Sequence, residues 1–223
     1  MTPRPGPPPD ERPARTYRSP LRTRRAAETR ERIAASARDL FAEHGFAGTT
    51  VAEVAEVAGV TPQTVYATFG SKGAIVGALL AQLEHDADAA GWLVRVRAEA
   101  DPRRKLADFA AWTSALLSSS KVALTAMHVA AGDPALAELR TQGDQHRRAA
   151  LRELVTDLEQ AGALSRDLTI ARGVDRAWML TGVELYLAAR DACGWSDAEY
   201  ADWLTRLLQD QLLDHPGDRL GRP

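Results

Sequence analysis

The chain has 223 residues, 45% of them hydrophobic, which suits a small domain plus a medium-sized one with packed cores. Its longest apolar run, residues 74–83, is too short to cross a bilayer, and no apolar segment typical of a secretory signal follows the first arginines. The single cysteine, Cys193, cannot form an internal disulfide. These features predict a cytoplasmic protein with no membrane partner.

The net charge of −2 conceals an asymmetry between the two ends of the chain. Residues 1–25 contain seven arginines and two acidic residues, whereas residues 81–223 contain 17 basic and 22 acidic side chains. A basic end on an acidic body favours local attraction to a polyanion, with a solvated tail as the alternative. Because residues 1–21 are rich in proline and arginine, we expect them to form a disordered arm.

Helical periodicity begins after the arm. The first helix is predicted over residues 23–44 and ends at Gly45, a residue type that commonly follows helix ends. Its apolar face consists of Ile33, Ala37, Leu40 and Phe41.

Two short helices with a tight turn between them are predicted next. Thr50 begins the first of these helices and forms a capping box with Glu53. Gly59 occupies the turn, where it can take a positive φ. Thr61 caps the next helix, which Gly70 ends. This pair of short helices around a glycine turn predicts a helix-turn-helix.

The remaining sequence also indicates helices separated by glycine, proline and capping residues. A long helix is predicted from Lys72 to about residue 99, and others at 102–118, before Gly132, at 134–162, at 168–193 after Asp167 and at 197–213 after Ser196. No segment shows sustained period-two alternation. We therefore expect an all-α fold of about nine helices: a helix-turn-helix domain at 22–71, a helical domain at 72–215 and a tail at 216–223.

The third predicted helix presents side chains that suit contact with DNA. Gln63 can pair with adenine, and the methyl groups of Thr64 and Thr68 can touch thymine. Tyr66 and Lys72, together with the helix-capping Thr50, are placed to bind phosphates. Each residue also has an ordinary alternative, namely a cap, a core aromatic or a surface lysine.

Residues 29–80 resemble the DNA-binding domain of the TetR family of transcription regulators. The resemblance rests on LFAEHGFAGTTV at 40–51 and AEVAGVTPQTVYATFGSK at 55–72, with Thr68 where the family often has histidine. It implies a non-enzymatic regulator, most often a repressor released from a palindromic operator by a small, largely apolar effector. The DNA-facing positions it implies are Thr50, Thr61, Gln63, Thr64, Tyr66, Thr68 and Lys72, to which Arg22, Arg24 and Arg25 are expected to add backbone or minor-groove contacts.

The resemblance also implies partners for the carboxyl-terminal half. Residues 177–204 resemble the end of a TetR-type domain, in which the last two helices form a homodimer. Two apolar stripes there suit such pairing, with packing inside one subunit as the alternative. The first stripe consists of Trp178, Met179, Val183, Leu185 and Tyr186, and the second of Trp195, Tyr200, Trp203, Leu204 and Leu207. No cofactor or metal is expected. Candidate effector-binding residues are Trp92, Phe109, Trp112, Met127, His128 and Trp178, any of which could instead be core. The long helix at 72–99 would link them to the DNA-binding domain.

The sequence fits two other classes of protein less well. An enzyme is disfavoured because the five histidines lack metal-binding spacing and no nucleophile elbow or phosphate-binding glycine loop occurs. A helical adaptor without DNA-binding activity is disfavoured by the helix-turn-helix pattern and the basic arm.

Overall fold

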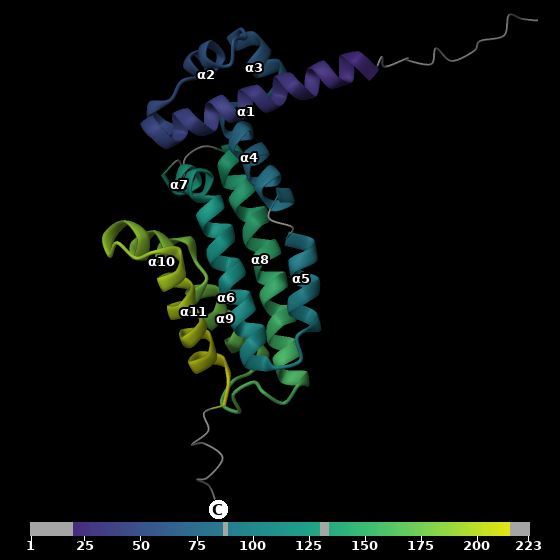
Figure 1. The fold of residues 1–223 in the computed structure, drawn as a ribbon, viewed down its shortest axis with the longest axis vertical. Coiled ribbons are helices and arrows are strands. Elements are labelled where there is room, and N and C mark those ends of the chain that lie inside the picture. Colours follow the sequence, from purple (N-terminus) through teal and green to yellow (C-terminus); the bar gives the residue numbers. More distant parts are fainter. Residues whose placement is uncertain (1–19, 87–88, 130–133, 215–223) are drawn as a thin grey trace, which may run out of the picture.

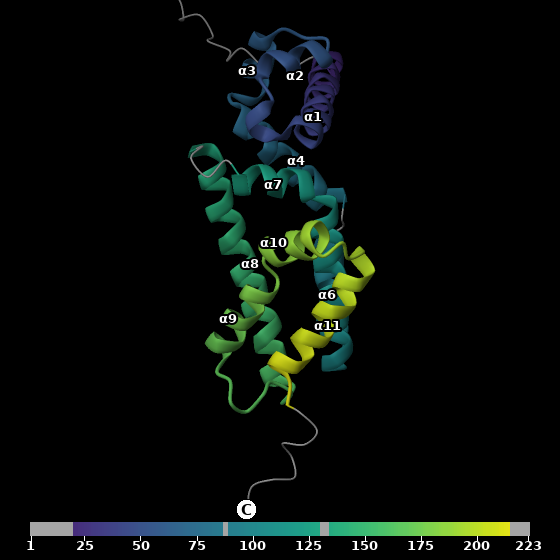
Figure 2. The same ribbon diagram turned by 90° about the vertical axis from the view of Figure 1, so that its left-hand side faces the viewer.

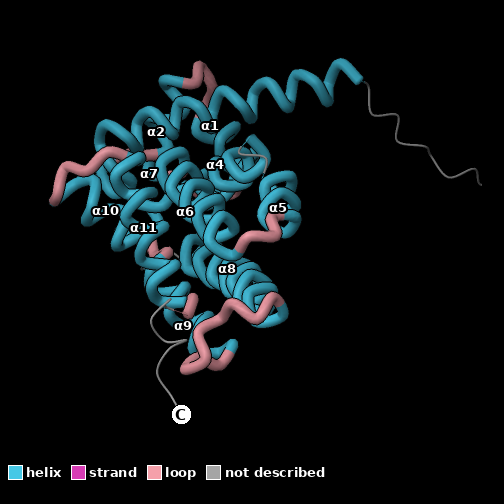
Figure 3. Tube along the Cα trace, turned by 60° about the horizontal axis from the view of Figure 1, so that its bottom comes forward, coloured by secondary structure: helices cyan, strands magenta, loops and turns pink. Residues whose placement is uncertain are grey.

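The computed structural model describes residues 20–86, 89–129 and 134–214. These residues form helices joined by loops, without a strand, which confirms the all-α class (Figure 3). An isolated antiparallel bridge joins Leu164 to Leu213. No single helix in this part of the chain is long and apolar enough to span a membrane, although α3 and the start of α4, bent by 58°, reach that length and composition together.

The described residues form an elongated molecule with two parts (Figure 1). The head consists of α1 (Pro20–Gly48), α2 (Val51–Val57) and α3 (Pro62–Phe69). The body, below it in Figure 1, contains α4 (Lys72–Asp86), α5 (Ala89–Ala98), α6 (Pro102–Ser119), α7 (Lys121–Val129), α8 (Pro134–Gln160), α9 (Ile170–Leu180), α10 (Val183–Leu187), a π-helical turn (Ala188–Ala192) and α11 (Asp197–Leu212).

Helix α1 is longer than the sequence pattern predicted. Its helical geometry is interrupted at Gly45, where φ is 72°, so the predicted helix end is visible as a kink. The predicted start of the helix is wrong: Pro20 and Leu21, which the sequence pattern places in the arm, belong to α1. Proline is tolerated in a first helical turn, where no backbone N–H is needed. Residues 1–19 of the predicted arm lie outside the described residues.

The helix predicted over 72–99 is described as two helical stretches. Helix α4 ends at Asp86 and α5 begins at Ala89, with residues 87–88 outside the described part of the chain. The middle of the predicted link from the head to Trp92 therefore lies outside the described residues.

The helix predicted over 168–193 is divided. Thr169, rather than Asp167, caps α9 by accepting a hydrogen bond from the backbone N–H of Arg172 at 3.3 Å. Helix α9 ends at Leu180, and Gly182 has an extended backbone before α10 begins. Glycine has a weak helix propensity, so a break costs little there. The other predicted starts, with Asp101 and Ser196 as caps, are confirmed.

Two separate cores hold the molecule together. One belongs to the head but extends into α4, α7 and the start of α8: it includes Ile33, Phe41, Val54, Val65, Ile75, Val76, Ala123, Ala126 and Leu136. The other lies inside the body and includes Leu106, Phe109, Leu151, Leu158, Tyr186, Tyr200, Leu204 and Leu208. Helix α7 runs between the head and the rest of the body, and it packs on α1 (Figure 2).

Helices α6 and α11 form the closest helix pair of the body and run antiparallel. At one end the Ser114 hydroxyl donates to the carbonyl of Asp197 at 3.0 Å. At the other end the Gln209 side chain donates to the carbonyl of Arg103 at 2.9 Å. These two contacts fix which turns of α6 and α11 face each other.

Candidate nucleic-acid interface

Local hydrogen bonds set where α2 begins. The backbone N–H of Glu53 donates to the Thr50 hydroxyl at 3.2 Å, and the N–H of Thr50 donates to the Glu53 carboxylate at 2.7 Å. These bonds from the Thr50 backbone and side chain lower the pKa of Glu53. The predicted capping box is therefore confirmed.

The turn and the ends of α3 also have the predicted geometry. Gly59 has a φ of 64° in the turn, and Gly70 has a φ of 82° at the end of α3. The Thr61 hydroxyl accepts from the backbone N–H of Thr64 at 3.2 Å and lies 2.9 Å from the Thr64 hydroxyl. Helix α3 is thus short, capped at both ends and held by α2 through the buried Val65.

One side of α3 faces solvent. Tyr66 is 53% exposed, an uncommon environment for a large aromatic side chain, and Gln63 and Ala67 are also exposed. Val65 and Phe69 point towards the head core instead. The exposed side combines an amide, a phenol and a small residue, which can approach base edges and phosphates closely.

The hydroxyl groups of the candidate threonines already take part in hydrogen bonds within the protein. Thr68 is half-buried, and its hydroxyl donates to the carbonyl of Thr64 at 2.7 Å, within α3. The hydroxyls of Thr50 and Thr61 are engaged in the caps. Their DNA contacts remain predictions that would have to coexist with these internal bonds.

Lys72 has contacts that the sequence pattern did not indicate. Its ammonium donates to the carbonyl of Phe46 at 2.7 Å and to that of Thr49 at 2.8 Å. It also lies 4.2 Å from the centre of the Phe46 ring. Lys72 therefore ties the start of α4 to the segment between α1 and α2, with one of its three N–H donors left for a phosphate.

Arg30 was missed by sequence reasoning. Its guanidinium donates to the carbonyl of Thr68 at 3.0 Å and lies 4.3 Å from the centre of the Phe69 ring. Arg30 thus holds the last turn of α3 against α1. The available signal was weak: Arg30 precedes the core residue Ile33 by one helical turn and so shares its face.

The predicted basic residues at the start of α1 are exposed. Arg22, Arg24 and Arg25 all face solvent, and Arg24 pairs with Glu28 one turn later, at 2.9 Å. The first buried core residue of α1 is Ile33, and the turns before Arg30 extend beyond α2 and α3 (Figure 1). These arginines form a basic projection from the head.

The candidate effector residues do not form one group. Phe109 and Trp112 are neighbours in the body core, with ring centres 6.1 Å apart, and Trp178 packs against the same core. Met127 packs against the head core instead. The side chains of Trp92 and His128 lie outside the described residues.

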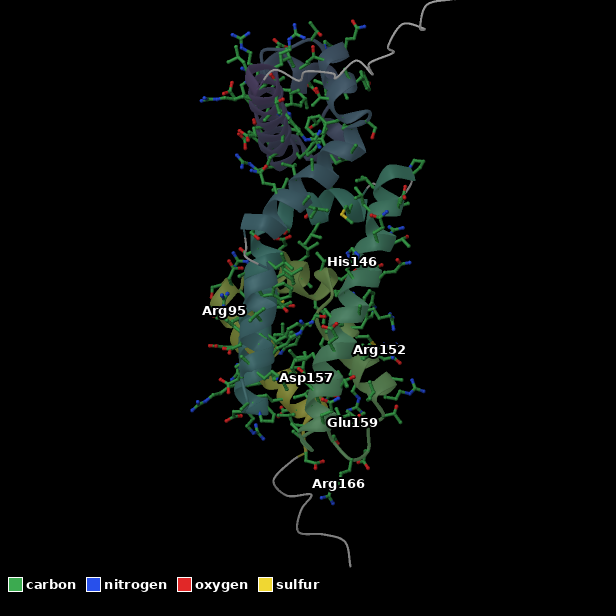
Figure 4. All side chains as sticks on the ribbon, turned by 90° about the vertical axis from the view of Figure 1, so that its right-hand side faces the viewer. Arg95, His146, Arg152, Asp157, Glu159 and Arg166 are labelled. Atoms are coloured by element: carbon green, nitrogen blue, oxygen red, sulfur yellow. The ribbon has the colours of Figure 1, made fainter. Side chains whose placement is uncertain are left out.

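Two hollows in the described part of the chain bear on effector binding. A small one, of about 20 Å³, lies between α5, α6 and α8 and is lined by Phe109, Ala150 and Leu154. Arg97 and Glu153, which also line it, form an ion pair, and a third lining residue, Asp157, is labelled in Figure 4. A larger hollow of about 240 Å³ lies where α1, α4 and α7 meet.

The fold and the exposed side of α3 define a helix-turn-helix protein with a helical body. Residues 33–79 match the family described as bacterial regulatory proteins, tetR family. The family match covers the amino-terminal part of the chain, and the fold of the whole chain is similar to that of solved tetR-family regulators.

Individual known proteins are similar to the amino-terminal part of the chain or to its fold. The HTH-type transcriptional regulator TtgR of Pseudomonas putida is 39% identical over 77 residues, which cover 34% of this chain and 37% of TtgR. The chain thus spans little more than a third of this curated relative. NalD of Pseudomonas aeruginosa, the secondary repressor of the MexAB-OprM multidrug efflux pump, has a similar fold, with 23% identity, coverage of 85% and 98%, and a TM-score of 0.69. SmeT, solved in complex with triclosan, has 17% identity, coverage of 85% and 93%, and a TM-score of 0.67.

Proposed function

We propose that the protein is a transcription regulator that binds double-stranded DNA through α3 and responds to a small molecule bound in the body. The observation that carries the proposal is the exposed side of α3, where Gln63 and Tyr66 face solvent while both helix ends are fixed by caps. Holding such a short helix rigidly lets its first turns enter a major groove. Two similar proteins, TtgR and NalD, are a transcriptional regulator and a repressor, which favours repression.

The regulator acts as a homodimer that joins two copies through α9–α10 and α11. Of the predicted apolar stripes, Tyr186, Tyr200 and Leu204 are buried within one subunit. Met179 and Leu185 remain 64% and 38% exposed, so they are the members of the stripes available to a second copy. A two-fold dimer would read a near-palindrome with half-sites about one helical turn, roughly 34 Å, apart.

Selection of bound genomic fragments followed by titration of the selected duplex tests the proposal. Gln63→Ala should weaken binding to the selected duplex by about 1–3 kcal/mol and relax the base preference, because an amide that pairs with one base edge is lost. The measurement is fluorescence anisotropy on selected and random duplexes.

Gln160→Ala, an exposed glutamine at the far end of α8, serves as the matched control and should bind like the parent. Equal losses on selected and random DNA for Gln63→Ala would contradict base reading by this residue.

The basic projection of α1 adds electrostatic contacts to DNA. Replacing Arg22, Arg24 and Arg25 by alanine should weaken binding to every duplex and reduce the salt slope by up to about three, because each lost phosphate contact releases one counterion fewer. Deleting residues 1–19 should cost much less. The matched control replaces the exposed Arg104, Arg152 and Arg206 of the body. A projection that only solvates the chain would leave the salt slope unchanged.

The effector acts on the head through helices that pack against one another. A Cβ added at Gly77 of α4 would lie 2.9 Å from Leu139 of α8, so these two helices are in close contact. Helix α7 packs on α1. A small molecule that shifts α8 or α7 would therefore change the angle of the head, and with it the separation of the two α3 helices in a dimer. SmeT, a protein of similar fold, was solved with the small molecule triclosan, which favours this mode of regulation.

A further inference from the structure

The larger of the two hollows lies between the head and the body. Helix α1 of the head crosses α4 and α7 and packs on both (Figure 1). The hollow is lined from α1, from the second half of α4, from the end of α6 and from the start of α7. Its volume of about 240 Å³ is far above the roughly 10–15 Å³ that one water molecule needs. It therefore has room for a small organic molecule, which would touch the head and the body at once.

Part of the lining of this head–body hollow is apolar. Leu79 of α4 and Ala123 of α7 are buried members of the head core, and Val122 packs against that core. Ala35 contributes a small side chain from α1. A molecule in the hollow would therefore bury apolar surface against these side chains, which favours binding.

Helix α1 adds one acidic and one basic side chain to the same hollow. Glu31, Ala35 and Arg38 are spaced i, i+4 and i+7, so they lie on one face of α1. With a rise of about 1.5 Å per residue, Glu31 and Arg38 are about 10.5 Å apart along the helix axis. Opposite charges thus stand at the two ends of one face, with a small apolar residue between them.

Both charged groups can still bind a ligand. The Glu31 carboxylate has no hydrogen bond or ion pair with any described residue. The Nε of Arg38 donates to Asp39 at 3.0 Å, but both side chains are more than half exposed, so this pair contributes little to stability. The two terminal nitrogens of Arg38 have no partner within residues 20–86, 89–129 and 134–214. Two such nitrogens can hold a carboxylate through parallel hydrogen bonds.

Two neutral polar side chains complete the lining. The Gln82 amide on α4 can donate and accept hydrogen bonds. The Ser119 hydroxyl at the end of α6 donates to the Leu116 carbonyl at 3.0 Å, and its oxygen can still accept. The hollow therefore suits a molecule that is apolar in the middle and polar at its ends.

We infer that the head–body hollow binds a small zwitterion with a short apolar middle, its ammonium group at Glu31 and its carboxylate at Arg38. Coulomb attraction sets this orientation. The site lies outside the body core, so it is separate from an effector site inside the body. Only the effect of the zwitterion on DNA binding rests on the proposed function.

Calorimetric titration of the full chain with three probes tests the charge pattern. trans-4-(Aminomethyl)cyclohexanecarboxylate carries both charged ends, whereas cyclohexanecarboxylate and cyclohexylmethylamine carry one each. The parent should bind the zwitterion roughly five times more tightly than either other probe, because each of these lacks one partly exposed ion pair. Equal affinities for the three probes, or no binding of the zwitterion at millimolar concentration, would overturn the inference.

Charge-removing variants test the orientation of the zwitterion. Glu31→Gln should lower its affinity roughly fivefold without changing that of cyclohexanecarboxylate, and Arg38→Gln should do the same without changing that of cyclohexylmethylamine. Glu43→Gln and Arg32→Gln are the matched controls, since both residues are exposed on α1 and neither lines the hollow. Losses of equal size in the controls would show a general effect of charge and would contradict the assigned site.

A variant that fills the hollow tests its location. Ala35 is exposed although it lines the hollow, so Ala35→Leu adds volume there without disturbing the core, and leucine is a good helix former. Affinity for the zwitterion should fall at least tenfold while Tm is retained. Ala27→Leu, at another exposed alanine of α1, is the control and should bind like the parent. Full affinity in a folded Ala35→Leu protein would place the bound molecule elsewhere and overturn the inference.

Operator binding separates this site from the proposed function. Because the zwitterion contacts the head and the body together, it should change the affinity of the parent for a selected duplex but not that of Ala35→Leu. A change of equal size in Ala35→Leu would overturn the inference. Constant DNA affinity with intact calorimetric binding would contradict only the effect on DNA. A parent that binds no DNA contradicts the proposed function alone, because the calorimetric tests use free protein.

Discussion

Lys72→Met is expected to remove binding to selected and random DNA alike and to destabilise the head. The substitution keeps the aliphatic stem but deletes the ammonium that donates to the carbonyls of Phe46 and Thr49. Losing charge-assisted bonds to partly buried carbonyls should lower the free energy of unfolding by about 2–3 kcal/mol. Thermal unfolding should show a decrease in Tm of about 5–10 °C.

Lys121→Met is the matched control. Lys121 pairs with Asp191 at 2.5 Å on the surface, where both side chains are at least 40% exposed, so its loss should change Tm little. The result that would contradict this prediction is an unchanged Tm of Lys72→Met, together with a decrease of about one in the salt dependence of its DNA binding. That result would mean that Lys72 serves mainly as a phosphate contact, as the sequence pattern predicted.

Replacing both Met179 and Leu185 by glutamate should convert the protein into a monomer. Two charges placed on the exposed parts of α9 and α10 would have to be buried without partners in a dimer interface. Binding to a two-half-site operator should fall by roughly 100-fold or more, because the second half-site is no longer bound intramolecularly. Analytical ultracentrifugation and anisotropy on whole and half operators measure the two effects.

Val94→Glu tests whether any charge on an exposed apolar position has the same effect. Val94 is 63% exposed on α5, away from α9 and α11, and the variant should remain dimeric with unchanged operator affinity. A dimer that survives in the Met179→Glu, Leu185→Glu protein would place the subunit contact elsewhere on the body.

The sequence predicted the head better than the body because the head depends on local signals. Thr50 and Glu53 are three residues apart, and Thr61 caps a helix whose first residue is Pro62, so both caps can be read within a few positions. The role of Lys72 could not be read in this way. Its carbonyl partners lie 23 and 26 residues earlier, and no residue type marks a carbonyl that will accept a bond.

The body shows the same limit for side chains that pack. Phe109 and Met127 look alike in the sequence as large apolar residues on helices, yet one belongs to the body core and the other to the head core. Periodicity gives the buried face of a helix but not the helix that it packs against. The hydrogen bonding of the two buried tyrosines could not be predicted either. Both lie on apolar stripes, yet the Tyr186 hydroxyl donates to Asp197, whereas the Tyr200 hydroxyl has no partner among the described residues.

The reach of the head core into α7 and α8 decides where this protein can be joined to another. A chimeric regulator made by exchanging residues up to the end of α4 would leave Ala123, Ala126 and Leu136 facing foreign side chains. Close-packed interiors tolerate such mismatches poorly. A head that is to be fused to another protein should therefore include α7 and the first turns of α8. These segments begin at Lys121 and Pro134, far along the chain from the end of α3 at Phe69.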